Sequence, residues 1–349
     1  MEFLKDIISE IGGEYVQLAS EINETETYVD TGSYIFNALV SGSIYGGVSG
    51  NKITAISGAS STGKTFFALA VIKHFLEQNP EGYCLYFDTE AAITKSLLQD
   101  RGLDVSRIIV INVVTVEEFR TKALKAVDIY MKKNKDERKP CFFVLDSLGM
   151  LSTNKEITDA LSENDKRDMT KASLIKGAFR MLTLKLGQAE IPMIVTNHVY
   201  ANVGGYGAPT VQSGGSGLLY SASTIIELSK SKEKEGTDVI GNIIKAKTYK
   251  SRLSKENQEV EIKLYYDERG LDRYYGLLQL GEYGGLWKRS AGRYEIDGKK
   301  IPEKTILSDP EKYFTKELMN KLDEISKSRF SYGNSKLSID VDEKLDGED

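Results

Sequence analysis

Short apolar runs alternate with helix-length segments between about residues 33 and 272. The runs are KITAISG, YCLYFDTE, IIVINVV, CFFVLDS, IPMIVTNHV and TIIELSK, followed by NIIKAKTY and EVEIKLYYD. The continuous Val, Ile and Phe character of the early runs predicts a parallel sheet that is buried on both faces and has helices as crossovers. The last two runs alternate more and end in turn residues, which predicts an antiparallel hairpin at the sheet edge.

The segments on either side of this core differ from it in sequence pattern and composition. Residues 1–32 read as a short helix and then polar, threonine-rich sequence, which is either a loose extension or an arm that docks elsewhere. Residues 273–330 predict a small α+β domain. Residues 331–349 end in LSIDVDEKLDGED, which predicts an acidic disordered tail.

Composition narrows the class of protein. With 349 residues, 40% hydrophobic and 28% charged, the chain is typical of soluble globular proteins. No run of eighteen apolar residues occurs, so we expect no membrane span. Cys84 and Cys141 lie in separate apolar runs, which favours a reducing compartment and predicts a cytoplasmic protein. The net charge of −5 argues weakly against nucleic acid as a partner, but local patches decide binding.

The strongest chemical signal is GASSTGKT at residues 58–65, between a predicted strand and the predicted helix KTFFALAVIKHFLEQ. It fits the phosphate-loop pattern G-x-x-x-x-G-K-[ST] in the context that this pattern requires. Backbone N–H groups of such a loop surround phosphates at the helix N-terminus. We expect Lys64 to reach the β- and γ-phosphates and Thr65 to place its hydroxyl on Mg²⁺. The predicted cofactors are therefore ATP and Mg²⁺, held by Gly58, Ala59, Ser60, Ser61, Thr62, Gly63, Lys64 and Thr65.

Acids and a histidine follow three further strand-like runs. Asp146 ends CFFVLDS, where a carboxylate supports Mg²⁺ or merely caps a helix. Glu90 follows YCLYF, where a carboxylate orients or deprotonates an attacking water, and Asp88 is its rival. His198 ends IPMIVTNH beside Asn197, and position alone leaves open whether either side chain senses a phosphate or is satisfied by backbone.

Three segments are candidates for contacts with other macromolecules. Residues 153–171 are polar and charged, so they form either a solvated helix face or a DNA-facing loop with Lys166, Arg167 and Lys171. Residues 199–217 predict a long structureless loop that is rich in glycine and free of charge; its backbone N–H groups suit phosphates, and the alternative is an inert surface loop. Residues 245–255, KAKTYKSRLSK, form either a solvated edge or a source of cations for a neighbouring subunit.

In this order the motifs resemble the RecA-type recombinases, most closely the bacteriophage UvsX branch. The resemblance covers about residues 33–325. It rests on GASSTGKT, YFDTEAAIT, FFVLDSLGMLS, VTNHVY, the glycine-rich loop, GGSGLLYSAS and the KSR of residues 250–252. It also includes YYGLLQLGE and AGRYEIDGKKI, which are similar to the small C-terminal domain of that family.

The resemblance implies a fold and roles for single residues. The fold is a RecA-like P-loop ATPase core at residues 33–272, with an N-terminal arm that packs on the next protomer. Glu90 activates water, and His198 senses the γ-phosphate. Lys250 and Arg252 reach the ATP of the neighbouring subunit, with Lys247 close in register. The two mobile DNA-binding loops match residues 153–171 and 199–217, which adds the DNA contacts Val203, Gly204, Gly205, Tyr206, Gly207, Gly214 and Gly215. The chain departs from the family at Thr94 and Leu97, which stand near the family's Asp and Tyr against adenine.

The function implied is that of a DNA-dependent ATPase that forms a helical filament on single-stranded DNA. It would catalyse homologous pairing with duplex DNA and strand exchange in recombination and repair. Its expected partners are DNA, further copies of itself, and single-strand-binding and mediator proteins. No membrane is expected among its partners. The alternatives are a nucleotide-gated recombination mediator or scaffold, a hexameric replicative helicase core, and a metabolic kinase. The helicase would need an upstream domain for which the short N-terminus leaves no room.

Overall fold

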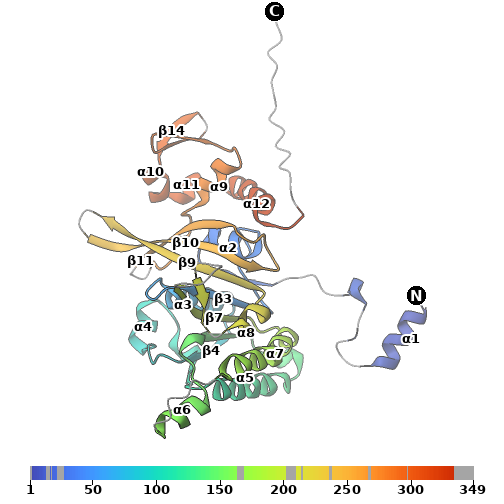
Figure 1. The fold of residues 1–349 in the computed structure, drawn as a ribbon. Coiled ribbons are helices and arrows are strands. Elements are labelled where there is room, and N and C mark those ends of the chain that lie inside the picture. The colour runs from blue at the N-terminus through green and yellow to red at the C-terminus, as the bar shows by residue number, and fades with distance from the viewer. Residues whose placement is uncertain are drawn as a thin grey trace, which may run out of the picture.

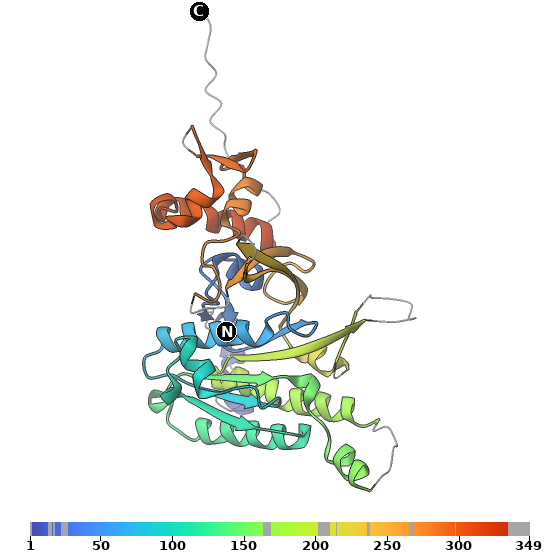
Figure 2. The same cartoon turned by 90° about the vertical axis from the view of Figure 1, so that its left-hand side faces the viewer.

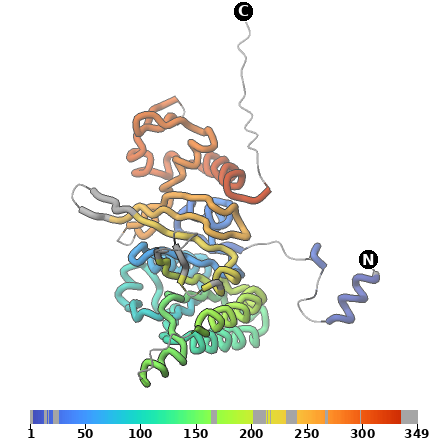
Figure 3. The backbone as a smooth tube through the Cα atoms, in the orientation of Figure 1, coloured from blue at the N-terminus to red at the C-terminus, as the bar shows by residue number. Residues whose placement is uncertain are grey.

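The computed structural model describes residues 2–12, 16, 18–21, 27–162, 169–201, 210–213, 215–235, 238–265, 269–296 and 298–333. Its body is an α/β core, with a group of C-terminal elements at one end and the helix α1 (Glu2–Ile11) lying apart from the rest (Figure 1). The backbone trace of Figure 3 sets α1 apart in the same way. Near the entry to the core, β1 (Tyr28–Val29) pairs with β2 (Val48–Ser49).

One large sheet forms the centre of the core, in the order β11-β10-β9-β3-β7-β6-β4-β5, with β8 paired to β7. The six strands from β9 to β5 in this order are parallel to one another, whereas β10 is antiparallel to both of its neighbours. The predicted mostly parallel sheet is thereby confirmed. The strands are β3 (Ile53–Gly58), β4 (Tyr83–Asp88), β5 (Ile108–Asn112), β6 (Cys141–Asp146), β7 (Met193–Ala201), β8 (Thr210–Gln212), β9 (Thr224–Glu235), β10 (Asp238–Ser251) and β11 (Glu259–Tyr265).

Helices cover both faces of this sheet (Figure 2). Alternate residues of β6 point to opposite faces: Phe142 and Val144 belong to the apolar core that includes α2 (Tyr34–Ser41) and α3 (Lys64–Gln78). Phe143 and Leu145 belong to the core that includes α5 (Val116–Met131) and α7 (Lys171–Ala189). Burial on both faces explains why the strand reads as a continuous apolar run.

Strand β5 departs from the expectation of two buried faces. Ile109 is 53% exposed and Val110 is 41% exposed. The reason is that β5 is the last strand of the sheet, paired on one side only, with β4. The apolar run predicted the strand correctly but did not reveal its place at the edge.

The far edge of the sheet holds two successive hairpins. The predicted hairpin of β10 and β11 is confirmed, with Ala246 opposite Val260. The segment that starts as TIIELSK continues to Glu235 and also pairs antiparallel with β10. The β9–β10 pair extends beyond the other strands of the sheet (Figure 1).

The C-terminal elements combine helices with a small sheet. Strands β12 (Lys288–Ser290), β13 (Arg293–Ile296) and β14 (Lys299–Pro302) are antiparallel. Around them lie α9 (Leu277–Tyr283), α10 (Glu303–Ser308), α11 (Pro310–Tyr313) and α12 (Lys316–Phe330). Asp323 of α12 accepts hydrogen bonds from Ser43 Oγ (2.5 Å) and the N–H of Ile44 (3.0 Å), which ties this group to the core just after α2. The domain limits at residues 32, 272 and 330 stay predictions.

Candidate functional site

The loop at residues 58–65 joins the end of β3 to the start of α3. Gly63 has φ +94°, a conformation that favours glycine. A Cβ at Gly58 would lie 2.7 Å from both the Leu228 carbonyl oxygen and Thr62 Oγ1, so the neighbouring strand β9 leaves no space for a side chain. Of the two glycines in the pattern, Gly63 is thus favoured by its φ angle and Gly58 by the lack of space for a Cβ. The loop between them leads into the N-terminus of α3.

Lys64 is buried at the base of this loop. Its Nζ donates to the carbonyl oxygens of Gly58 (3.1 Å) and Ala59 (2.9 Å). Burial lowers the pKa of Lys64, and the nearby carboxylates of Asp146 and Glu90 act in the opposite direction. The ammonium group thus lies within the loop, where it fits a polyphosphate ligand held by backbone N–H groups.

Asp146 ends β6 directly opposite the start of α3. Its Oδ2 accepts hydrogen bonds from Thr65 Oγ1 (2.8 Å) and Tyr86 OH (2.6 Å), and its Oδ1 accepts one from Thr196 Oγ1. Burial and the adjacent Asp146 carboxylate raise the pKa of Tyr86 well above its usual value. A carboxylate and a hydroxyl side by side are the oxygen donors that Mg²⁺ prefers, so Thr65 and Asp146 fit an ion carried by a nucleotide.

Asp88 and Glu90 have different environments. Asp88 is buried and accepts hydrogen bonds from the N–H groups of Glu90 (2.9 Å) and Ile93 (3.2 Å), which makes it a strand-end acid satisfied by backbone. The Glu90 side chain is 35% exposed, and its Oε1 accepts from Ser147 Oγ at 2.8 Å. Of the two rivals, Glu90 is the one free to face a ligand.

His198 links this carboxylate to the glycine-rich segment. Its Nε2 lies 3.3 Å from Glu90 Oε1, and its carbonyl oxygen accepts from the N–H of Ser213 (2.9 Å). Asn197 Nδ2 donates to the Ser213 carbonyl oxygen at 3.0 Å. Two adjacent residues of β7, Asn197 and His198, therefore contact Ser213, which directly follows β8, and His198 also contacts the candidate catalytic acid.

The expectation of a structureless loop at residues 199–217 is wrong for its described parts. Val199 pairs with Gln212 in the β7–β8 hairpin, and α8 begins at Ser216. Antiparallel pairing satisfies backbone groups that an open loop would leave to solvent. Gly215 has φ +72° and lies against Ala172 of α7. The predicted DNA contacts Val203, Gly204, Gly205, Tyr206, Gly207 and Gly214 lie outside the described residues.

The other candidate DNA segment, 153–171, contains α6 (Asn154–Leu161). Thr153 and Glu156 form a capping box at its start. Lys171 Nζ lies 3.7 Å from Glu156 Oε2, at the start of α7. Lys166 and Arg167 lie outside the described residues. In Figure 2, α6 and the yellow-green end of β7 extend to the same side of the molecule.

Lys250 and Arg252 lie far from the phosphate loop of their own chain. Lys250 is opposite Ile225, at the end of β9 remote from Leu228 and Gly58. Its Nζ donates to the carbonyl oxygens of Leu219 (2.5 Å) and Ala222 (2.8 Å) at the end of α8 (Ser216–Ser221). Burial first, and then the charge of Arg252, lower the pKa of Lys250.

Lys247, close in register to this pair, has a different setting. It is exposed and lies opposite Glu227 on β9, whereas a bulge between Thr248 and Lys250 interrupts the alternation of β10. Lys247 is thus exposed on the face of the sheet, whereas Lys250 and Arg252 donate hydrogen bonds to carbonyl oxygens at the end of α8.

Several site residues were missed by the sequence reasoning. Tyr86, Thr196 and Ser147 contact the two carboxylates, and Lys230 Nζ donates to the Ser61 carbonyl oxygen of the phosphate loop. Strand alternation predicts that Tyr86 shares a face with Asp88, but its contact with Asp146 can be predicted only when the order of the strands is known.

Thr94 and Leu97, which stand near the family's Asp and Tyr positions, lie at the start of a helix. Thr94 caps α4 (Lys95–Asp100) by accepting a hydrogen bond from the N–H of Leu97 at 3.2 Å.

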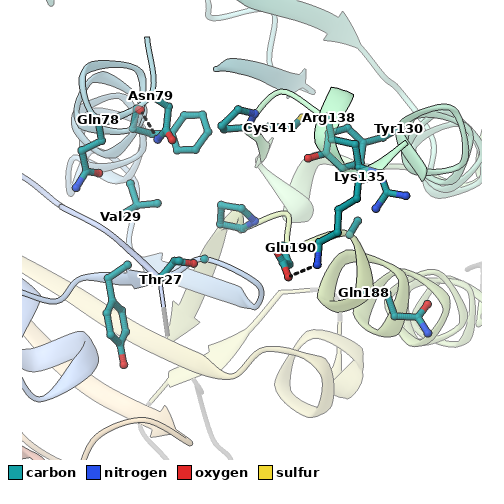
Figure 4. Close-up of a pocket in the computed structure, with 16 residues that line it drawn as sticks. Thr27, Val29, Gln78, Asn79, Tyr130, Lys135, Arg138, Cys141, Gln188 and Glu190 are labelled. Atoms are coloured by element: carbon teal, nitrogen blue, oxygen red, sulfur yellow. Dashed lines mark hydrogen bonds and ion pairs between the residues drawn. The ribbon is translucent and has the colours of Figure 1, made fainter. Parts of the chain in front are cut away.

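A cavity of about 420 Å³ lies at the opposite end of the sheet (Figure 4). Cys141, the first residue of β6, lines it, whereas Asp146 at the other end of that strand belongs to the phosphate site. Its lining is mixed, with an ion pair of 3.9 Å between Lys135 and Glu190. This cavity is therefore separate from the candidate site, which is identified by the polar groups that converge at the other end of the sheet.

Two searches of the described residues gave negative results. None of the helices they form is long and apolar enough to cross a membrane. Nor do the described His, Cys, Asp and Glu side chains gather into groups of three that could hold a metal ion. A magnesium ion at Asp146 would therefore depend on nucleotide phosphates for further ligands.

Comparisons with known proteins agree with this geometry. The family model of the RecA N-terminal domain matches residues 2–272. The Recombination and repair protein of Enterobacteria phage T4 is 32% identical over 79% of this chain and 69% of its own length. Protein RecA of Desulforapulum autotrophicum is 26% identical over 83% of this chain and 79% of its own length. Protein RecA of Cereibacter sphaeroides is 28% identical, over 73% of this chain and 71% of its own length. The chain therefore belongs to the RecA family.

Proposed function

We propose that this protein is a DNA-dependent ATPase and recombinase, which forms a filament on single-stranded DNA and exchanges strands with a homologous duplex. One observation carries the proposal. His198 lies 3.3 Å from Glu90 and its backbone pairs with Ser213, so one residue joins the candidate water-activating acid to the glycine-rich segment. A link of this kind gives nucleotide state a physical route to a DNA-binding loop.

The nucleotide site consists of residues from the ends of β3 and β6, which lie on either side of β7, and from the start of α3. Bound ATP with Mg²⁺ would supply the γ-phosphoryl group and a cation that neutralises its developing charge. Residues 58–65 hold the phosphates through backbone N–H groups, and Lys64 neutralises negative charge at the loop base. Thr65 and Asp146, whose oxygens are 2.8 Å apart, would hold the ion.

Glu90 acts as the general base for an attacking water. Ser147 Oγ holds one carboxylate oxygen at 2.8 Å, and His198 lies against the same oxygen. The second oxygen is available to accept a proton, and a positioned general base contributes about 10²–10⁴-fold to rate. Asp88 does not compete, because backbone N–H groups occupy both of its oxygens.

Coupling to DNA passes through the β7–β8 hairpin. A change at His198 on loss of the γ-phosphate shifts Ser213, which Asn197 also holds at 3.0 Å. Loop ordering by a γ-phosphate is a known switching mode, and thermodynamic linkage makes the effect mutual. DNA should therefore tighten ATP binding by the same factor as ATP tightens DNA binding.

Assembly explains the residues that lie far from the site. Lys250 and Arg252 lie at the end of β10, and Lys250 is three positions along the sheet from the residues beside their own phosphate loop, which suits a role toward the ATP of a neighbouring protomer. The exposed apolar residues of α1 suit packing against another copy. We place the protein in a reducing cytoplasm, that of the host if it is viral, because both of its cysteines are buried free thiols.

The first test measures ATP hydrolysis with and without single-stranded DNA, for the wild type and for Glu90→Gln. We expect DNA to stimulate the wild type, and the variant to lose about 10²–10⁴-fold in rate while still binding nucleotide. Glu81→Gln, an exposed acid paired with Lys139, is the matched control and should keep full activity.

Strand exchange between homologous DNA molecules then separates a recombinase from a helicase or a scaffold. Hydrolysis that DNA leaves unchanged would reject the proposal and would turn attention to a scaffold or kinase. If Glu90→Gln kept full activity, only the assignment of Glu90 as the general base would be rejected, and the rest of the proposal would stand.

A further inference from the structure

The Asp146 carboxylate is surrounded by three hydroxyl donors from three different elements. Thr65 comes from α3, Tyr86 from β4 and Thr196 from β7. Tyr86 and Thr196 are both 0% exposed, so neither hydroxyl has access to bulk water. A buried hydroxyl needs a partner, and here both direct their hydrogen atoms to the same carboxylate.

The sheet topology brings these groups together. β6 lies between β4 and β7 in the sheet, with Asp88 opposite Asp146 and Leu145 opposite Val195. Tyr86 is two residues before Asp88, so its ring points to the same face as Asp146 and lies along the strand direction. The phenol then spans the distance to Asp146, which a shorter side chain at position 86 would not reach.

We infer that Tyr86 and Thr196 are positioning residues that fix the Asp146 carboxylate for a nucleotide-bound Mg²⁺. The inference deepens the proposed function and rests on it. Thr65 is expected to give its hydroxyl oxygen to the ion, which leaves Tyr86 and Thr196 as the two donors that hold the carboxylate. Groups hydrogen-bonded to a metal-binding carboxylate orient it and tune its affinity.

The hydrogen bonds of Tyr86 and Thr196 also indicate which part of nucleotide binding depends on these two residues. Within the described part of the chain, the Tyr86 and Thr196 hydroxyls donate to Asp146 and not to residues 58–65, whose backbone is proposed to bind phosphate. Loss of either hydroxyl should therefore weaken the contribution of the metal ion and leave the affinity for the metal-free nucleotide unchanged. This separation distinguishes positioning of the carboxylate from general support of the fold.

The experiment measures the dissociation constant of a fluorescent ADP analogue at saturating Mg²⁺ and in EDTA. The ratio of the two constants is the gain in affinity due to the ion, and it involves no hydrolysis. Tyr86→Phe and Thr196→Val remove one hydroxyl each with almost no change in volume. We expect each to reduce the gain about 10-fold, the lower end of the range for such outer partners, with the EDTA value unchanged.

Tyr83→Phe is the matched control, because Tyr83 lies on the same strand and its hydroxyl faces the Cys141 thiol at the other end of the sheet. It should keep the wild-type gain. Binding of Mn²⁺ to each protein–ADP complex, followed by electron paramagnetic resonance, gives a second readout of the ion itself.

An unchanged gain in both Tyr86→Phe and Thr196→Val would overturn the inference while the proposed function stands. Equal weakening in Mg²⁺ and in EDTA would also overturn it, since the hydroxyls would then support the fold of the phosphate loop. A wild type that binds the nucleotide neither with Mg²⁺ nor in EDTA would reject the proposed nucleotide site and the inference together, whereas binding that Mg²⁺ does not improve would overturn the inference alone.

Discussion

The ion pair between Asp30 and Arg273 joins the beginning of the core to the residues that follow β11. Arg273 Nη1 lies 2.6 Å from Asp30, and Asn37 Nδ2 and the N–H of Gly32 donate to the same carboxylate. Burial acts to raise the pKa of Asp30, but these hydrogen bonds and the Arg273 charge outweigh it and lower the pKa below its usual value. The contact spans 243 positions of sequence, so it fastens two distant segments.

The lowered pKa of Asp30 predicts a defined pH dependence. Its contribution to stability is present above the unfolded-state pKa of about 3.9 and is lost as the pH falls through the lower folded-state value. We expect Asp30→Asn to lower the free energy of unfolding by about 2 kcal/mol at pH 7. Urea unfolding of both proteins at pH 7, 5, 4 and 3 should show the difference shrinking below about pH 4.

His74, whose pKa is lowered by burial, also faces Asp30, so each comparison is made at one pH for both proteins. Glu81→Gln, which breaks an exposed pair, should have a small effect at every pH. A loss as large at pH 3 as at pH 7 would contradict the electrostatic origin of the effect.

At the scale of elements, helices α7 and α8 meet at a glycine. A Cβ on Gly217 would lie 2.8 Å from the backbone nitrogen of Lys176. Backbone cannot yield as a flexible side chain does, so this contact sets the spacing of the two helices. Because α8 directly follows the β7–β8 hairpin, this spacing also positions the proposed DNA loop.

Two glycine substitutions on this pair of helices should have opposite signs. Gly217→Ala is expected to destabilise the protein by about 1–3 kcal/mol through overpacking. Gly177→Ala lies on α7 with open space around the new Cβ, and it should stabilise by about 1 kcal/mol because alanine is the better helix former. Urea unfolding measures both, and a neutral Gly217→Ala would mean that the helices separate without cost.

At the scale of the whole molecule, α1 presents apolar residues that have no partner within the described chain. Phe3 is 73% exposed and Ile11 is 67% exposed, with Leu4 and Ile7 on the same side of the helix. The helix lies apart from the core in Figure 1, so its apolar face is available to another copy. The proposed filament supplies such a partner.

The double substitution Phe3→Ser and Ile7→Ser should weaken self-assembly. Burial of two such side chains contributes about 3 kcal/mol or more, which corresponds to a change of roughly 100-fold in association. Sedimentation with ATP and single-stranded DNA measures the effect, and Lys5→Ser on the same helix is the control. Thermal unfolding should not change, and filaments of normal length would count against the arm.

The sequence by itself determined the strands, the phosphate loop and the family. GASSTGKT, with a strand before it and a helix after it, specifies a phosphate site through residues that are neighbours in the chain. The apolar runs specified strands because burial on both faces leaves a continuous pattern. The rule that functional side chains gather at the ends of parallel strands made Asp146, Glu90 and His198 candidates, and the resemblance to the RecA-type recombinases implied the roles of Glu90 and His198.

Only the tertiary structure decided which of these groups touch. Contacts of Asp146 with Tyr86 and Thr196, of His198 with Ser213 and of Lys250 with the end of α8 depend on strand order and register. The length of β9 and the hairpin within residues 199–217 depend on pairing with strands elsewhere in the chain. A local sequence pattern does not identify such distant partners. The reason is that every backbone can form hydrogen bonds between strands, so strand order and register decide which donor meets which acceptor.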